Sequence, residues 1–389
     1  MNEEKTVKNQ HIYFKNADLD YFLQYALACQ TYQGSAYGEC FYAASQVHEE
    51  DLESWVQAWT TVAQKVEAVA RNAEASGHRV SARETYLRAA TYYAVAMVCV
   101  SPRDPRFREF YETFRAAFRR SAAFQEIPLE IVTIPFEGKS LSGYFWRATG
   151  SPERRPTLIV LGDRFAEEMY VWGGAPAAVS RGYHVLLIDL PGQGITPFDG
   201  LYTTAHAEVP VGAMVDYLSF RNDVDPSHIA LYGVASSGYM ATRAVAFEKR
   251  ISACIADAPL DDMESLMMAE APSSSHLPES ELALRSILFD LTSWQAGKAQ
   301  LPELFDVFKG MKVDDVSRIT CPMLCLVSTG EVAERIRQTR KIYELLSNPK
   351  SALHIFTEEE GADAHNQANN LSLLHEIVFD WLDEVYSAG

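Results

Sequence analysis

The 389-residue chain lacks the features that would place it in a membrane or on a nucleic acid. It has no uninterrupted run of about 18 apolar residues, and its first ten residues, MNEEKTVKNQ, contain no apolar signal region. Its 34 Lys and Arg are outnumbered by 52 Asp and Glu, which gives a net charge of −18. Because nucleic acids and anionic membranes need clustered cations, we expect neither as a partner, and we expect a cytoplasmic protein.

The cysteines form no C-x-x-C pair, so the spacing typical of zinc and redox motifs is missing. They lie mostly in apolar contexts, which predicts buried, reduced thiols. We accordingly expect no metal and no cofactor. The six are Cys29, Cys40, Cys99, Cys254, Cys321 and Cys325.

What the sequence does contain changes in character near residue 128. Residues 17–125 have apolar positions at three-to-four spacing, which predicts helices throughout, and we assign residues 1–127 to a helical N-terminal cap. Gly77 predicts the end of the second helix, and Ser81 with Glu84 predicts a capping box that opens the third.

An aromatic-rich set lies on these predicted helices and allows two interpretations. The set packs as a helix–helix core, or part of it lines a cavity that accepts an aromatic ligand. Its members are Trp55, Trp59, Tyr86, Tyr92 and Tyr93.

From residue 128 onward, short β-rich runs alternate with helical segments. LEIVTIPF and LSGYFWRA, joined through Glu137-Gly138, predict an antiparallel pair. Continuous apolar strands alternating with helices predict a mostly parallel sheet covered on both faces, which binds ligands at the carboxyl ends of its strands. The fold class is therefore α/β, with a core over residues 128–389 and a helical insertion over 260–312 that we expect to act as a lid. The later strands are expected in TLIVLGD, HVLLIDL, IALYGV, ISACIADA and MLCLVST.

Residues 229–241, IALYGVASSGYMA, run from an apolar strand through a glycine into a helix-like segment. A nucleophile elbow, G-x-S-x-G, has this pattern between a strand and a helix. The residue two after Gly233 is Ala235, not serine. A second register would place Ser236 at the apex, but it puts the β-branched Val234 where a glycine is expected. We favour the register with Ala235 at the nucleophile position.

Together with the elbow, three further motifs occur along the chain in the order that an α/β-hydrolase requires. They are Gly162-Asp163 after one strand, the Pro191–Gly194 turn PGQG after the next, and His365 in the loop GADAHNQANN. With the helical segments ESWVQAW and GHRVSARETYLRAATYY, the chain resembles one branch of the α/β-hydrolase superfamily over residues 15–385. That branch holds bacterial 2,6-dihydroxypseudooxynicotine hydrolase and hydrolases that shorten polyketide chains by retro-Claisen cleavage.

The resemblance implies a Ser–Asp–His hydrolase fold with a small acyl or aromatic, polyketide-like substrate held between cap and core. It implies oxyanion-hole amides from Ser236 and from Gly162 or Asp163. Ser237 remains a nearby hydroxyl, and Tyr239 matches the family's usual glycine–tyrosine continuation. Arg164, Glu167 and Glu168 follow the oxyanion loop as candidate substrate contacts. Members of the branch are often dimers, so a homodimer stays open.

The acid of the triad is irregular. The family carries an aspartate in a G-E-x-D segment, whereas this chain reads Gly330-Glu331-Val332-Ala333-Glu334. The carboxylate is therefore lost, or Glu331 or Glu334 supplies it. The resemblance makes His365 the base.

A further acidic group follows the predicted strand ISACIADA. These residues cap and begin a helix, or one of them orients His365 or contacts substrate, for which Glu264 matches the family best. The group comprises Asp257, Asp261, Asp262 and Glu264.

Three functional hypotheses remain, because alanine cannot act as a nucleophile. In the first, His365 carries out serine-independent acid–base chemistry of the cyclase or lyase type. In the second, Ala235 replaces the serine of an ordinary C–C or ester hydrolase. In the third, the fold is catalytically dead and serves as a binding or scaffold protein.

Overall fold

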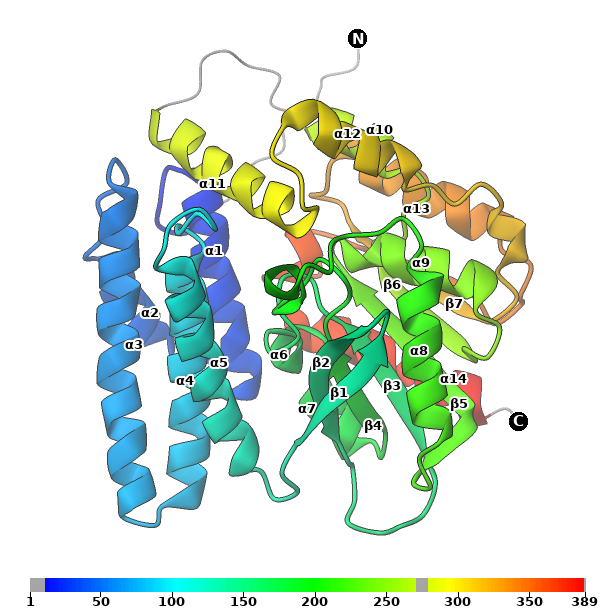
Figure 1. Cartoon of the computed structure of the whole chain (residues 1–389), viewed down its shortest axis with the longest axis horizontal. Coiled ribbons are helices and arrows are strands. Elements are labelled where there is room, and N and C mark those ends of the chain that lie inside the picture. The colour runs from blue at the N-terminus through cyan, green and yellow to red at the C-terminus, as the bar shows by residue number, and fades with distance from the viewer. Residues whose placement is uncertain (1–10, 271–278, 388–389) are drawn as a thin grey trace. The chain divides into compact units, whose positions relative to one another are not determined.

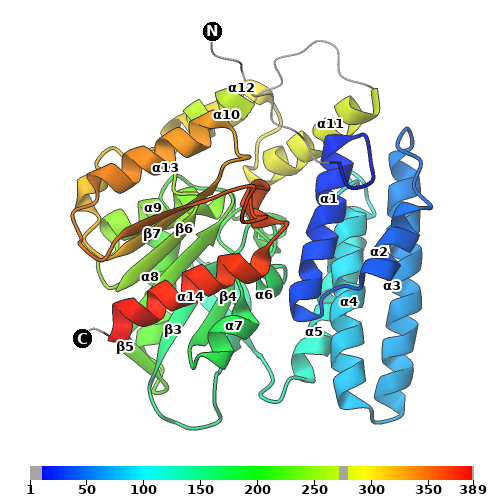
Figure 2. The same cartoon turned by 180° about the vertical axis from the view of Figure 1, so that it is seen from behind.

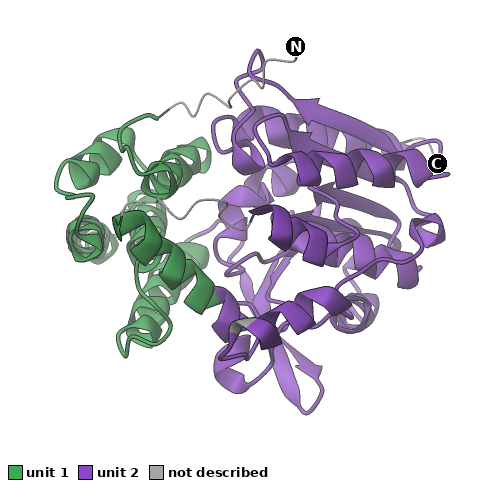
Figure 3. Ribbon diagram, turned by 90° about the horizontal axis from the view of Figure 1, so that it is seen from above, with its two compact units in different colours: residues 1–124, 273–291 green, residues 125–272, 292–389 purple. Residues whose placement is uncertain are grey.

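The computed structural model describes residues 11–270 and 279–387. The N-terminal decapeptide and residues 271–278 of the expected insertion lie outside the described residues. The chain forms two compact units, residues 1–124 with 273–291 and residues 125–272 with 292–389 (Figure 3). Part of the segment expected as one insertion thus groups with the N-terminal unit. Its action as a lid stays a prediction.

The first unit is helical, as predicted. Its third long helix begins at Arg79 after His78, and Ala82 N already bonds to His78 O at 2.9 Å, so the capping box expected at Ser81 is wrong. The preceding helix ends as expected at Gly77, whose φ of 75° is open to glycine. The helices are α1 (Ala17–Ala28), α2 (Tyr37–Ala44), α3 (Leu52–Ala75), α4 (Arg79–Met97), α5 (Phe107–Ala123) and most of α11 (Glu279–Gln295), with a 3₁₀ turn at Cys29–Tyr32.

The aromatic set forms the core of this unit. The Trp55 and Trp59 rings lie 5.5 Å apart, and Trp59 lies 5.7 Å from Tyr92. The tyrosine hydroxyls are engaged as well, since Tyr93 donates to Glu67 at 2.7 Å and Tyr92 to Glu39 at 2.6 Å. These partners support the structural interpretation, because buried hydroxyls bound to carboxylates contribute to helix packing.

The second unit contains an eight-stranded sheet in the order β1-β2-β4-β3-β5-β6-β7-β8. β2 runs antiparallel to both β1 and β4, and all other neighbouring pairs are parallel. This architecture confirms the predicted fold class. The strands are β1 (Glu130–Phe136), β2 (Lys139–Trp146), β3 (Arg155–Leu161), β4 (His184–Ile188), β5 (Val224–Val234), β6 (Ala253–Asp257), β7 (Met323–Ser328) and β8 (Ala352–Phe356).

Helices cover both faces of the sheet. α8 and α9 pack on one face, and α7 and α14 lie on the other, as the two opposite views show (Figures 1 and 2). The strands are buried on both faces for this reason, which explains their continuous apolar runs. The helices are α6 (Met169–Trp172), α7 (Ala175–Ser180), α8 (Glu208–Ser219), α9 (Ser237–Phe247), α10 (Met263–Glu270), α12 (Leu301–Gly310), α13 (Ala333–Leu345) and α14 (Leu371–Ser387), with 3₁₀ turns at Thr196–Asp199, Val316–Arg318 and His365–Gln367.

The structure also bears on the predictions for the cysteines and for membrane-spanning helices. Cysteines are all free, and only Cys321 among them is partly exposed. Within the described residues, none of the helices combines the length and apolar character needed to cross a bilayer.

Trp59→Ala should lower the free energy of unfolding by about 3–5 kcal/mol, because it leaves a cavity in the aromatic core of the first unit. Val69→Ala is the matched control on the same helix, since Val69 is 57% exposed and should change stability by less than about 0.5 kcal/mol. Denaturant unfolding monitored by circular dichroism measures both. Equal effects of the two variants would contradict a core role for Trp59.

Candidate active site

The elbow turns from β5 into α9 at Ala235. Ala235 has φ of 55°, the left-handed region that alanine rarely adopts, whereas Ser236 has an ordinary φ of −61°. Ala235 N donates to Asp257 O at 2.7 Å, and Ala235 O accepts from Gly238 N at 3.0 Å. Of the two registers left by the sequence, the structure therefore has the one with Ala235 at the apex.

Two positions of this turn have room only for glycine. A Cβ on Gly233 would lie 2.1 Å from Ser237 O, and one on Gly238 would lie 1.9 Å from Ala258 O. Both distances are far below van der Waals contact with backbone atoms that cannot move aside. The sequence thus keeps the tight packing of a nucleophile elbow around a residue that has no nucleophile.

The loop after β3 contains Gly162 and Asp163, whose amides the sequence offered for an oxyanion hole. Gly162 N donates to Ile188 O at 3.0 Å, so this amide is already bound, and the expectation that it serves an oxyanion hole is wrong. Its carbonyl accepts a short hydrogen bond from Ser237 Oγ. The expected Ser236 amide donates to the Asp163 carboxylate at 3.3 Å, and Ser236 Oγ donates to the same oxygen at 2.6 Å.

The other residues expected near this loop bond to protein groups. Tyr239 is fully buried and its hydroxyl donates to Ala205 O at 3.1 Å, so a substrate contact through that hydroxyl is not supported. Arg164 pairs with Glu168 at 2.7 Å. Glu167 accepts a hydrogen bond from Tyr144 at 2.7 Å. Substrate contacts by Arg164, Glu167 and Glu168 stay predictions.

His365 and Glu331 form a dyad at the carboxyl ends of β7 and β8. His365 Nδ1 lies 2.8 Å from Glu331 Oε1, and Asn366 Nδ2 lies 3.1 Å from His365 Nε2. Glu331 is almost completely buried, while the His365 side chain is 38% exposed. The second Glu331 oxygen, Oε2, lies 3.3 Å from Arg335 Nε, which holds the carboxylate from the opposite side. This arrangement fixes the proton on Nδ1 and leaves Nε2 as the acceptor.

Charge determines the ionisation of this dyad. Burial by itself would raise the pKa of Glu331, but His365 and Arg335 outweigh burial and lower that pKa to about 2. Desolvation likewise works against the charged form of His365, but the Glu331 carboxylate raises the His365 pKa overall. Glu331 is thus an anion across the physiological range, and His365 is a stronger base than a free imidazole.

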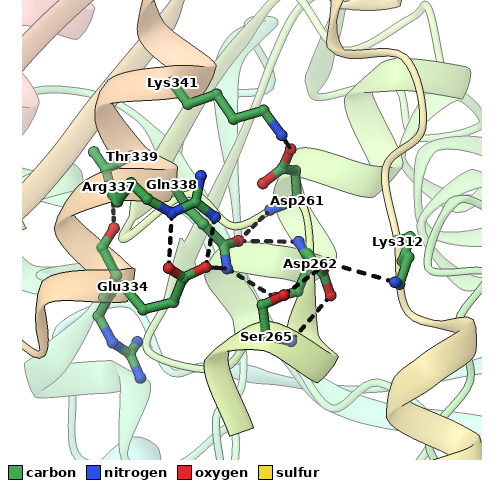
Figure 4. Close-up of polar contacts among 10 residues, drawn as sticks. Asp261, Asp262, Ser265, Lys312, Glu334, Arg337, Gln338, Thr339 and Lys341 are labelled. Carbon is green, nitrogen blue, oxygen red and sulfur yellow. Dashed lines mark hydrogen bonds and ion pairs between the residues drawn. The ribbon is translucent and has the colours of Figure 1, made fainter. Parts of the chain in front are cut away.

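Two carboxylates that the sequence offered as partners of His365 bind elsewhere. Glu334 pairs with Arg337 at 2.6 Å and accepts from Gln338 at 2.8 Å, as Figure 4 shows, so its candidacy as the triad acid is wrong. The Glu264 carboxylate lies 3.1 Å from Lys312 Nζ, and its role as a catalytic or substrate-binding residue stays a prediction. Both glutamates lie on helices, where a long acidic side chain can pair with a basic side chain nearby on the surface.

The remaining carboxylates of this acidic group have structural partners. Asp262 accepts from Ser265 N at 3.1 Å in the first turn of α10, which matches a helix cap, and Asp261 pairs with Lys341 (Figure 4). Asp257 is different, because it is fully buried at the end of β6 and accepts from Gln367 Nε2 at 3.3 Å. Burial and the nearby Glu331 charge raise the pKa of Asp257 to about 7.

Sequence reasoning missed three residues that hold the site together. Gln193, in the PGQG turn, donates to Ser237 Oγ at 3.1 Å. Gln367 Nε2 donates both to the Asp257 carboxylate and to Ser328 Oγ, the latter at 2.7 Å. Arg335 lies four residues after Glu331, a helical spacing that signals a charge pair and could have been noticed. The two glutamines carry no such signal, because their partners are distant in the sequence.

Glu331→Gln should lower the pKa of the His365 imidazole, because it removes the anion that stabilises the imidazolium. A nuclear magnetic resonance titration of the histidine rings measures this pKa directly. In the unmodified protein it should lie above about 6.5, so the ring loses its proton only above that pH, and the variant should lose it at lower pH. Glu334→Gln is the control and should leave the titration unchanged. A shift in both variants, or in neither, would contradict the dyad.

No family model matches the chain. Among curated proteins, the hydrolyase poxO of Penicillium oxalicum is 32% identical over 270 residues, which cover 65% of this chain and 63% of poxO, less than two thirds of that protein. The hydrolase LUC6 of a Fusarium species is 28% identical over 92% of this chain and 94% of its own length. The 20-hydroxy-prefusarin hydrolase FUS2 of Gibberella moniliformis is 28% identical over 92% and 93%.

Solved structures share the fold across nearly the whole chain. The 2,6-dihydroxy-pseudo-oxynicotine hydrolase superposes with a TM-score of 0.76 at 20% identity, covering 93% of this chain and 96% of that one. AbyA5 superposes with a TM-score of 0.71 at 15% identity, covering 96% and 95%. Together with the sheet order and the elbow, these comparisons show that the chain has the α/β-hydrolase fold, with a helical unit preceding the sheet in sequence, and that its sequence is similar to proteins named hydrolases.

Proposed function

We propose that this chain is an enzyme that transforms a polyketide-like or aromatic-ketone substrate by proton transfer, without an acyl-enzyme. The observation that carries the proposal is the contrast between an intact base and an absent nucleophile. His365 is oriented by Glu331 at 2.8 Å and made more basic by that carboxylate, as suits a general base, while the apex of the elbow carries only the methyl group of Ala235.

His365 Nε2 is the atom that takes the proton. The hydrogen bond between Nδ1 and Glu331 keeps the other nitrogen unprotonated at a pH above the His365 pKa, and the Glu331 anion stabilises the imidazolium that forms. A proton removed next to a carbonyl produces an enolate, which can cyclise or eliminate water. A proton removed from a hydroxyl group β to a carbonyl instead starts a retro-aldol cleavage, in which the carbon–carbon bond breaks and the enolate leaves. The reaction is therefore of the cyclase or lyase type.

The substrate class is supported by the resemblance of the sequence and by the relatives. FUS2, similar over 92% of this chain, is named as a hydrolase of 20-hydroxy-prefusarin, and poxO is named a hydrolyase. The comparisons thus agree with a natural-product substrate and with a role in secondary metabolism.

One observation favours a second candidate, a Ser–Glu–His hydrolase in which alanine replaced the serine. Ala235 keeps a left-handed backbone, and Gly233 and Gly238 keep the close packing that a nucleophile elbow needs. Under this hypothesis Ala235→Ser alone should create a strong esterase. Under the first hypothesis it should not, because the native chemistry never used this position.

High-resolution mass spectrometry of reaction mixtures tests the proposal. The protein is incubated with a panel of aromatic β-diketones and polyketide esters. We expect a product that has the mass of its substrate, that has lost one water, or that has split into two fragments without gaining water. His365→Ala should lower the rate by about 100-fold or more, because general-base catalysis contributes about that factor.

Glu334→Ala serves as the control in this assay and should retain full activity. Products that sum to substrate plus one water would contradict serine-independent chemistry and support the hydrolase. Conversion that His365→Ala leaves unchanged would remove the base. A chain that binds no panel member in calorimetry and co-purifies with a protein would favour the scaffold hypothesis.

A further inference from the structure

The backbone amide that follows the apex of this elbow donates to a carboxylate. In a serine hydrolase, the amide of the residue after the nucleophile and an amide of the loop after β3 bind the oxyanion. The residue after Ala235 is Ser236, and its amide and its hydroxyl both donate to Asp163 Oδ1, at 3.3 Å and 2.6 Å. Asp163 itself belongs to the loop after β3, so the chain supplies an anion to its own anion-binding position.

The loop that carries Asp163 is fixed on both sides. The preceding Gly162 is held through its amide by Ile188 O at 3.0 Å and through its carbonyl by Ser237 Oγ. Ser237 Oγ in turn accepts from Gln193 Nε2 at 3.1 Å. The backbone that precedes Asp163 is therefore held by hydrogen bonds to β4 and α9, and through Ser237 to the PGQG turn.

The charge of Asp163 has no counter-ion within the described residues. The nearest basic residue along the loop, Arg164, pairs with Glu168 at 2.7 Å. Only Oδ1 of Asp163 accepts hydrogen bonds among the described residues, so Oδ2 has its acceptor capacity left, and the residue is partly exposed. A substrate oxygen that developed negative charge beside Ser236 N would meet this carboxylate, and like charges in contact are strongly unfavourable.

We propose that Asp163 is a specificity-determining residue: its carboxylate occupies the oxyanion position, closes the site to acyl transfer, and accepts a hydrogen bond from a hydroxyl group of the substrate. The proposal deepens the proposed function and rests on it for the identity of the reaction. The elbow is closed to serine-type hydrolysis twice, once by the methyl group of Ala235 and once by the carboxylate of Asp163.

Restoring the nucleophile in two steps tests the closure. The variants Ala235→Ser and Ala235→Ser/Asp163→Ala are compared by hydrolysis of p-nitrophenyl acetate and by covalent labelling with a fluorophosphonate, read by intact mass. We expect the single variant to stay near background. The double variant should exceed it by about 100-fold, the usual value of one oxyanion-hole donor, because the Ser236 amide is released.

Ala235→Ser/Glu334→Ala is the matched control, since it removes one carboxylate from a surface ion pair outside the site, and it should behave like the single variant. Thermal unfolding of every variant verifies the fold. Equal rates of the single and the double variant, whether high or low, would overturn the closure. A lower unfolding temperature with no gain in rate would show that Asp163 only caps α9.

A second measurement tests the hydroxyl. For a panel substrate that the protein converts, KM is compared with that of its O-methyl ether in the unmodified protein and in Asp163→Ala. We expect the ether to bind at least ten-fold more weakly in the unmodified protein and equally well in the variant. A preference for the hydroxyl that survives in Asp163→Ala would contradict this part. Because the nitrophenyl acetate assay needs no native substrate, a failure of the proposed function leaves the closure result intact.

Discussion

The structure around the candidate site depends on one steric constraint, the turn from β5 into α9 within two residues. The turn forces a left-handed backbone on Ala235 and leaves no space for a Cβ at Gly233 or Gly238. A residue held in such a conformation costs free energy that the surrounding packing must offset. The hydrogen bond from Ala235 N to Asp257 O and the hydrogen bonds of Ser237 and Gln193 are interactions that offset this cost.

The same constraint explains why the rest of the site is assembled where it is. Asp257 ends β6, receives the elbow amide through its backbone, and binds Gln367 through its side chain. Gln367 lies two residues after His365, so the loop of His365 is connected to the elbow through one buried residue, Asp257. The base and the empty nucleophile position are thus parts of one hydrogen-bonded unit, although no nucleophile is present to use them together.

The sequence predicted the parts of this arrangement that local pattern determines. The sheet followed from apolar runs alternating with helices, and the elbow from Gly233 and Gly238, because those glycines meet backbone atoms a few residues away or on the neighbouring strand. The start of α4 was misplaced because a local capping motif at Ser81 competed with a helix that already begins at Arg79. Glu331 could be named as a candidate acid but not chosen over Glu334, since the choice depends on which carboxylate turns inward after β7. The bonds between Ser236 and the Asp163 carboxylate could not be predicted at all, because they join residues 73 positions apart.

The names of the relatives and the residue at the apex of the elbow indicate different reactions. The relatives are named hydrolases or a hydrolyase, and the fold is that of the superfamily, yet the apex of the elbow lacks the serine on which a serine hydrolase depends. A fold supplies positions, and the residues at those positions determine the reaction. This chain has a histidine bonded to a buried glutamate and the close packing of the elbow, while alanine stands at the apex.

Turnover of a converted substrate in water enriched in oxygen-18 tests whether the site works without hydrolysis. Mass spectrometry then counts heavy oxygen atoms in any carboxylate of the product, a group that does not exchange its oxygens with water on the time scale of the assay. We expect that no carboxylate oxygen comes from the solvent. One heavy oxygen per turnover in a newly formed carboxylate would contradict it.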